Sequence, residues 1–247
     1  MRPILWLENA DVAPWSTAMR CFARCVLLCL SLGLASCGRD NELYYVAYRG
    51  DTNAVQEYLD SGGDVNRSIR KFGSTVTTML HVAVDRANVP LVEFLLARGA
   101  DPNKLDRWQR TGLIAAVQQT HPYLVKLMLN FGADPNLPDG YGHGATPLYH
   151  AAMLTNPTLF DTWRVAETIS ALWAAGADMN TTTACGESPL FVVEDPIIAE
   201  LLIAAGVDPM IRLPTGQSAV DVALAQSRCE VLTVLTNALA KINSHEP

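Results

Sequence analysis

Apolar residues along the chain recur at spacings of three and four in short stretches, and each stretch is followed by a polar or glycine-containing segment. Leu80 and Val84 share one face of a predicted helix, and Leu91 and Leu95 share a face of the next one. Gly99 follows the second stretch, where a left-handed residue commonly ends a helix. The pattern therefore predicts pairs of short amphipathic helices, each pair apolar on one side.

Two motifs mark the return of this helical pair along the chain. A turn motif, Gly-Ala-Asp-Pro-Asn, occurs at 99–103 and 132–136, becomes Gly-Ala-Asp-Met-Asn at 176–180, and has weaker copies at 62–66 and 206–210. A hexapeptide precedes four of these copies, and its first residue is Thr or Ser, both good helix N-caps. The hexapeptides begin at Thr78, Thr111, Thr146 and Ser188.

The motifs and their spacing resemble the ankyrin repeat, whose hexapeptide reads Thr-Pro-Leu-His-x-Ala and whose period is about 33 residues. The resemblance implies an all-α fold, an ankyrin-repeat solenoid of about six helix-turn-helix units with hairpin-like loops. One pair of helices cannot bury its own apolar side, whereas a stack of pairs can. We expect an ankyrin-repeat domain at 41–243, with units at 41–72, 73–107, 108–142, 143–183, 184–213 and 214–243.

Two units depart from the regular length. The fourth unit has nine more residues between its opening Thr and closing Asn than its neighbours, and we expect the insertion near 155–163, between the two helices. The fifth unit has three fewer, which a shortened inter-helix turn at 194–196 would explain. The two cysteines of the repeats, Cys185 and Cys229, are predicted to be free, with Cys229 buried as a small apolar residue.

The N-terminal segment has the composition of an export signal. Two arginines precede an apolar run at 25–34, which is too short to span roughly 30 Å of hydrocarbon as a helix. The sequence Leu-Ala-Ser-Cys at 34–37 resembles the bacterial lipobox, which implies cleavage before Cys37 and acylation of Cys37. We expect a signal segment at 1–36, with the true start at Met1 or Met19, and a lipid-anchored linker at 37–40.

The resemblance to bacterial lipoproteins also implies a location. With Gly38 after the cysteine, it favours the bacterial cell envelope, at the periplasmic face of the outer membrane. An ordinary cleaved signal and an uncleaved signal anchor remain as alternatives.

Charge and motifs narrow the function classes. The net charge of −7 is a poor match for nucleic acid, which needs a basic surface. No Gly-x-Ser-x-Gly, His-Glu-x-x-His or phosphate-binding loop occurs, and no Cys-x-x-Cys pair occurs that would indicate a zinc-knuckle or thioredoxin-like site. We therefore expect no catalysis, no cofactor and no metal. An enzyme that uses the fourth-unit insertion as a lid is the rival hypothesis.

The resemblance implies that partners bind to the hairpin loops, here called fingers, and to the first helix of each pair. The fingers are expected at 67–73, 104–110, 137–143, 181–186 and 211–216. Basic and aromatic side chains gather in the first three, which favours a partner with an acidic patch. The candidate partner-binding residues are Arg70, Lys71, Phe72, Arg107, Trp108, Arg110 and Tyr141.

Alternatives exist for these residues. Trp108 could instead pack against a neighbouring finger, with the arginines merely solvated. A second candidate surface is the fourth-unit insertion, with Leu159, Phe160 and Trp163. The resemblance gives His81 a structural role, in which its imidazole joins neighbouring fingers by hydrogen bonds.

The sequence thus predicts a monomeric, non-enzymatic module that binds a protein and acts as an adaptor or an inhibitor of its partner. An immunity or antitoxin-like protein that neutralises a secreted effector is the alternative.

Overall fold

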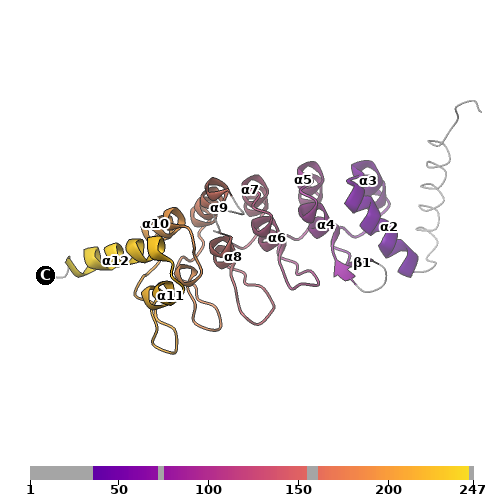
Figure 1. Cartoon of the computed structure of the whole chain (residues 1–247). Coiled ribbons are helices and arrows are strands. Elements are labelled where there is room, and N and C mark those ends of the chain that lie inside the picture. The colour runs from indigo at the N-terminus through magenta and orange to yellow at the C-terminus, as the bar shows by residue number, and fades with distance from the viewer. Residues whose placement is uncertain (1–35, 72–74, 155–160, 245–247) are drawn as a thin grey trace, which may run out of the picture.

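The computed structural model describes residues 36–71, 75–154 and 161–244. These residues form successive pairs of helices stacked side by side in one elongated row (Figure 1). The pairs are α2 (Ser36–Arg49) with α3 (Thr52–Asp60), α4 (Met79–Asp85) with α5 (Val89–Ala97), α6 (Gly112–Gln118) with α7 (Pro122–Asn130), α8 (Pro147–Met153) with α9 (Thr162–Ala174), the 3-10 turn η1 (Pro189–Phe191) with α10 (Pro196–Ala204), and α11 (Ala219–Ala225) with α12 (Cys229–Ser244).

The two helices of a pair have separate places in the stack. The first helices and the fingers lie on one side, and the second helices lie on the other (Figure 1). The first finger contains a short antiparallel hairpin of β1 (Ile69–Lys71) and β2 (Thr75–Thr77), in which Ile69 pairs with Thr77. None of the helices in the described part of the chain is long and apolar enough to cross a bilayer.

The structure describes only the last residue of the predicted signal segment. The predicted signal lies outside the described residues except for Ser36, and the helix α2 begins at that residue. Residues 37–40, which we expected to form a linker, are therefore the first turn of α2.

Local sequence sets the bounds of the helices. The hydroxyl oxygens of Thr78, Thr111 and Thr146 each accept a hydrogen bond from the backbone N–H three residues later, at 3.3, 3.1 and 3.4 Å. Each threonine thereby satisfies one of the free N–H groups at a helix start. At the other end of α7, Phe131 is the C-cap and Gly132 follows it with a φ of +85°, a conformation that favours glycine.

The apolar core runs unbroken through the stack. The leucine at the third position of each hexapeptide is at most 1% exposed, in Leu80, Leu113, Leu148 and Leu190. The second helices bury Leu95, Met128, Leu172 and Leu202 completely. Fully burying such a side chain contributes about 1.5–3 kcal/mol, and much of this burial is against a neighbouring pair. The predicted all-α solenoid of helical pairs is confirmed.

The asparagine that closes each turn motif connects one unit to the next. The Asn103 Nδ2 donates a hydrogen bond to the carbonyl of Gly132 at 3.1 Å, and its Oδ1 accepts one from the Asp134 N–H at 2.8 Å. The aspartate two residues before each asparagine caps its own turn, as Asp101 does for the Asn103 N–H at 2.8 Å. The same pair of inter-unit bonds is made by Asn66, Asn136 and Asn180.

The insertion in the fourth unit is divided between two places. The helix α9 has 13 residues, whereas α5, α7 and α10 have nine each, so part of the insertion lengthens the second helix. The remainder lies between Leu154 and Asp161, where residues 155–160 are outside the described part of the chain. The expectation that the whole insertion separates the helices was incomplete.

The shortening of the fifth unit falls in its first helix, not in the turn at 194–196 that we expected. Only the three-residue turn η1 forms, whereas α4, α6, α8 and α11 have seven residues each. Arg228 from the last unit donates hydrogen bonds to the carbonyls of Phe191 at 2.8 Å and Val193 at 2.6 Å. These bonds replace helical partners that the short turn cannot supply.

The last pair of helices corrects one prediction about the cysteines. Cys185 and Cys229 are both free, as expected, but Cys229 is exposed at the start of α12. The prediction of burial rested on the repeat pattern, which places Leu at this position, but Cys229 belongs to the last pair of helices, and no further unit packs over α12 among the described residues. Leu224 of α11 is 64% exposed for the same reason.

The asparagine bonds give the first testable prediction. Asn103→Ala removes two inter-unit hydrogen bonds, each contributing about 0.5–1.5 kcal/mol, so we expect the free energy of unfolding to fall by about 1–3 kcal/mol. Urea denaturation followed by circular dichroism measures this. The matched control is Asn130→Ala, at the exposed end of α7, and a loss no larger than the control's would contradict the role assigned to the turn asparagines.

Candidate partner-binding surface

The second finger, at 104–110, is held at its base by one buried carboxylate. The Asp106 side chain is 0% exposed, and its Oδ1 accepts hydrogen bonds from the backbone N–H groups of Trp108 at 2.8 Å and Arg110 at 2.9 Å. Its Oδ2 accepts from the Arg110 guanidinium at 3.1 and 2.9 Å. A buried charge is tolerated when it is paired and hydrogen-bonded in this way. The conformation of the finger around Trp108 is therefore fixed.

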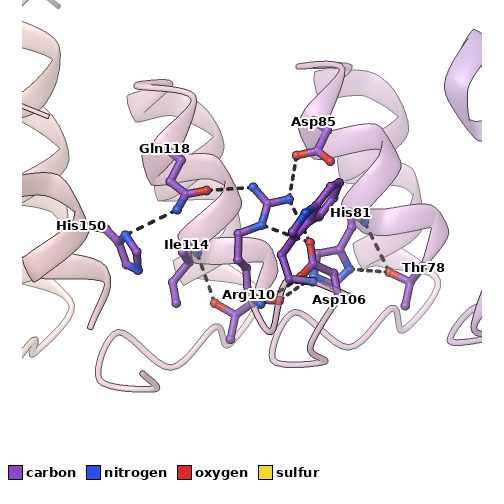
Figure 2. Close-up of polar contacts among 10 residues, drawn as sticks. Thr78, His81, Asp85, Asp106, Arg110, Ile114, Gln118 and His150 are labelled. Carbon is purple, nitrogen blue, oxygen red and sulfur yellow. Dashed lines mark hydrogen bonds and ion pairs between the residues drawn. The ribbon is translucent and has the colours of Figure 1, made fainter. Parts of the chain in front are cut away.

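Arg110 continues this network across the stack (Figure 2). Its guanidinium also donates to Asp85 of α4 at 3.3 Å and to Gln118 of α6 at 2.8 Å. The Gln118 amide donates to His150 of α8 at 3.4 Å, and the His150 Nε2 donates to Asp139 of the third finger at 2.9 Å. Each side chain donates to the next, from Arg110 through Gln118 and His150 to the Asp139 carboxylate. Together with the bond from Arg110 to Asp85, this network joins the second, third and fourth units.

His81 connects α4 to the second finger. The Thr78 hydroxyl lies 2.8 Å from the His81 Nδ1, and the His81 Nε2 donates to the Arg110 carbonyl of the second finger at 3.1 Å. Burial lowers the pKa of His81, against the nearby Asp106 charge, so the neutral imidazole is the form that the fold selects. The predicted structural role of His81 is confirmed.

Trp108 lies between two arginines. The Arg107 guanidinium stacks over its ring at 3.7 Å, and the Arg110 guanidinium lies 4.7 Å from the ring centre. Trp108 remains 36% exposed, and Arg107 is exposed as well. The finger thus presents an aromatic ring with a stacked cation on a fixed backbone.

A hollow opens beside this ring. It has a volume of about 140 Å³ and lies between the second finger and the first helices of the first two units. Its walls are formed by Tyr44, Tyr48, Thr77, Val82, Asp85, Arg86, Arg107 and Trp108. Trp108 is therefore at the edge of a concave feature, where interface anchors are commonly found.

A family model described as "Ankyrin repeats (3 copies)" matches residues 43–139 and 80–161. The ankyrin repeat domain ABAYE2397 from Acinetobacter baumannii has a TM-score of 0.68 and 24% identity, over 80% of this chain and 97% of its own. The chain has the fold of an ankyrin-repeat solenoid, and residues 43–161 match the ankyrin repeat itself.

Another similar structure is the complex of the predatory endopeptidase Bd0816 from Bdellovibrio bacteriovorus with the immunity protein Bd3460. The matched chain has a TM-score of 0.65 and 24% identity, over 79% of this chain and 96% of that chain.

Among curated proteins, an L-asparaginase from Dirofilaria immitis is 39% identical over 72 residues, which are 29% of this chain. This chain spans only 12% of the length of that relative.

The ankyrin fingers bring together some of the predicted residues. Arg107 and Trp108 are adjacent and accessible, whereas the Arg110 side chain is 14% exposed and is already bonded within the chain. Tyr141 is 56% exposed on the third finger. Arg70 and Lys71 lie on β1 with side chains outside the described part of the structure, and Phe72 is outside it altogether.

The insertion of the fourth ankyrin repeat contributes a second exposed aromatic residue. Trp163, at the start of α9, is 59% exposed, and Leu159 and Phe160 lie outside the described residues. Asp161 and Arg164 beside it form an ion pair at 3.3 Å, with side chains 62% and 42% exposed. Both side chains are on the surface of the described residues, whereas an enclosed polar pocket beside them would have favoured the enzyme with a lid.

Several residues of the surface were not predicted from the sequence. Asp106 carried a signal, since an aspartate in a turn commonly accepts a hydrogen bond from the backbone N–H two residues later, as Asp106 does from Trp108. Tyr48 and Arg86 carried none, because their places beside the second finger depend on how two units stack. Among the described residues, no group of three His, Cys, Asp or Glu side chains is placed to hold a metal ion.

The buried carboxylate gives the second prediction. Asp106→Ala leaves the Arg110 guanidinium without its buried partner, and we expect a loss of about 3–5 kcal/mol in the free energy of unfolding. Asp60→Ala is the matched control, because Asp60 pairs with Arg98 at 3.0 Å on the surface, where such a pair contributes less than about 1 kcal/mol. Equal losses in thermal or urea unfolding would show that Asp106 does not hold the finger.

Proposed function

We propose that the chain is a non-enzymatic module that binds one protein partner through its fingers and first helices, and that it acts as an adaptor or an inhibitor. The observation that supports this most is the second finger, where Trp108 and Arg107 are exposed on a backbone fixed by buried Asp106. A surface fixed before binding loses little conformational entropy on association, which favours affinity.

The partner surface is proposed to be acidic. The chain carries a net charge of −7, yet exposed arginines, Arg86 and Arg107, gather beside the second finger. Complementary charge on the partner speeds association and disfavours wrong partners.

A narrower proposal is an immunity protein that neutralises a secreted effector. It is supported by the similarity in fold to a chain of the complex between an endopeptidase and an immunity protein from Bdellovibrio. At 24% identity this similarity concerns the fold, so the identity of any effector is a matter for experiment.

We further propose that the chain is anchored by a lipid on Cys37 at the periplasmic face of the bacterial outer membrane. The lipobox-like sequence at 34–37 supports the anchor. Because α2 begins at Ser36 and Asp40 is paired with Arg67 at 3.0 Å, a lipid at this position would hold the first repeat close to the bilayer.

The partner proposal is tested by crosslinking the full chain in envelope preparations and identifying what is captured. Replacing both Arg107 and Trp108 with Ala should weaken binding of that partner by about 30-fold or more, as loss of a central aromatic anchor costs about 2 kcal/mol. The control is Trp173→Ala, which removes an aromatic residue 50% exposed on α9. Equal binding by the double variant and the control would exclude the second finger as the contact.

The anchor proposal is tested by growing cells with a fatty-acid probe. We expect the wild-type chain to incorporate the probe and Cys37→Ser to lose it, because the thiol at 37 is the proposed acceptor. Cys29→Ser, which alters another cysteine of the same segment, should keep the label. Labelling that survives Cys37→Ser would contradict the anchor.

A further inference from the structure

The hollow beside Trp108 has the dimensions of a site for one side chain. Its volume of about 140 Å³ is below the roughly 300–1,000 Å³ of pockets that enclose small-molecule ligands. Its walls come from α2, β2, α4 with its C-cap Arg86, and the second finger, so the hollow forms only where the first two repeats and the second finger pack together. An anchor residue inserted from a protein surface would fill a space of this size.

Two cations flank the hollow without acidic partners. The Arg86 guanidinium lies over the Tyr48 ring at 4.5 Å, and the Arg107 guanidinium lies over the Trp108 ring at 3.7 Å. Within the described residues, no carboxylate pairs with either of them. A guanidinium stacked on a ring keeps its in-plane N–H donors available for a carboxylate.

The acidic residues nearby are both paired with one arginine. Asp85, which lines the hollow, is paired with Arg110 at 3.3 Å, and Asp106 beneath the finger is paired with the same guanidinium at 2.9 Å. With Arg86 and Arg107 added, these five groups carry a net charge of about +1, in a chain whose overall charge is −7. The local charge therefore favours a negatively charged occupant.

The remaining walls are apolar and aromatic. Tyr44 stacks on Tyr48 with ring centres 6.0 Å apart, and buried Val82 lies at the same hollow. Such walls suit the methylene groups of a side chain whose end is charged.

We propose that this hollow receives a glutamate or aspartate side chain from a protruding loop of the partner protein, with Arg86 and Arg107 holding its carboxylate. This rests on the proposed function, because it requires a protein partner on the finger surface. It adds Tyr48 of α2 and Arg86 at the end of α4 to the candidate partner-binding residues, all of which the sequence had placed on the fingers.

The direct test adds two short blocked peptides, acetyl-Gly-Glu-Gly-amide and its Gln counterpart, to the chain that begins at Cys37, the product of the proposed cleavage. Binding is followed by NMR of the protein. We expect the glutamate peptide to shift the Arg86 and Arg107 Nε–H signals and the Trp108 indole N–H signal, and the glutamine peptide to leave them in place. Arg86→Gln should reduce the shifts at Arg107 and Trp108 at least five-fold. The control is Arg98→Gln, since Arg98 also stacks on a ring, that of Phe94 at 4.8 Å, away from the hollow.

Three results would overturn the inference: equal shifts with both peptides, no shift with either, or equal shifts with inorganic phosphate. The crosslinked partner separates this inference from the proposed function. If the Arg107 and Trp108 double variant loses the partner while Arg86→Gln binds it like the wild type, the finger contact stands and the hollow is not its anchor. If Arg86→Gln weakens partner binding at least ten-fold, with Arg98→Gln unchanged, the hollow is part of the interface.

Discussion

The structure depends on one constraint: a pair of short helices has too little apolar contact within itself and must cover its sides with neighbouring pairs. The leucines of the hexapeptides and the apolar residues of the second helices are buried because units stand on both sides of them. The turn asparagines add hydrogen bonds between the same neighbouring units. Apolar packing and these bonds together fix the distance between units and the register of one unit on the next.

The same constraint shapes the surface that we propose to bind a partner. Because the units are held in register, the second finger lies against the first helices of two repeats and a hollow forms between them. The network from Asp106 through Arg110, Gln118 and His150 then fixes the fingers relative to the helices beneath them (Figure 2). Binding residues such as Arg107 and Trp108 are left to face solvent on this rigid base.

The repeating part of the fold was predictable from the sequence, because the helix caps, the apolar positions and the closing glycine recur in the same order in successive units. The predictions failed where a unit departs from its neighbours. Nothing in the sequence of the fifth unit shows that its first helix shrinks to one 3-10 turn, since Arg228, which replaces the missing bonds, comes from another unit. Burial of Cys229 was predicted wrongly because the position is apolar in the repeat pattern only where a neighbouring unit covers it, and no described unit covers α12.

These helical pairs fold only against each other, and comparing one unit with three units tests this most directly. Thermal melts followed by far-ultraviolet circular dichroism would compare a peptide of the third unit alone, 108–142, with a fragment of three units, 73–183. If the pairs need their neighbours, the fragment melts cooperatively and the peptide does not. A single unit that is helical and melts cooperatively by itself would show that the pairs do not depend on stacking.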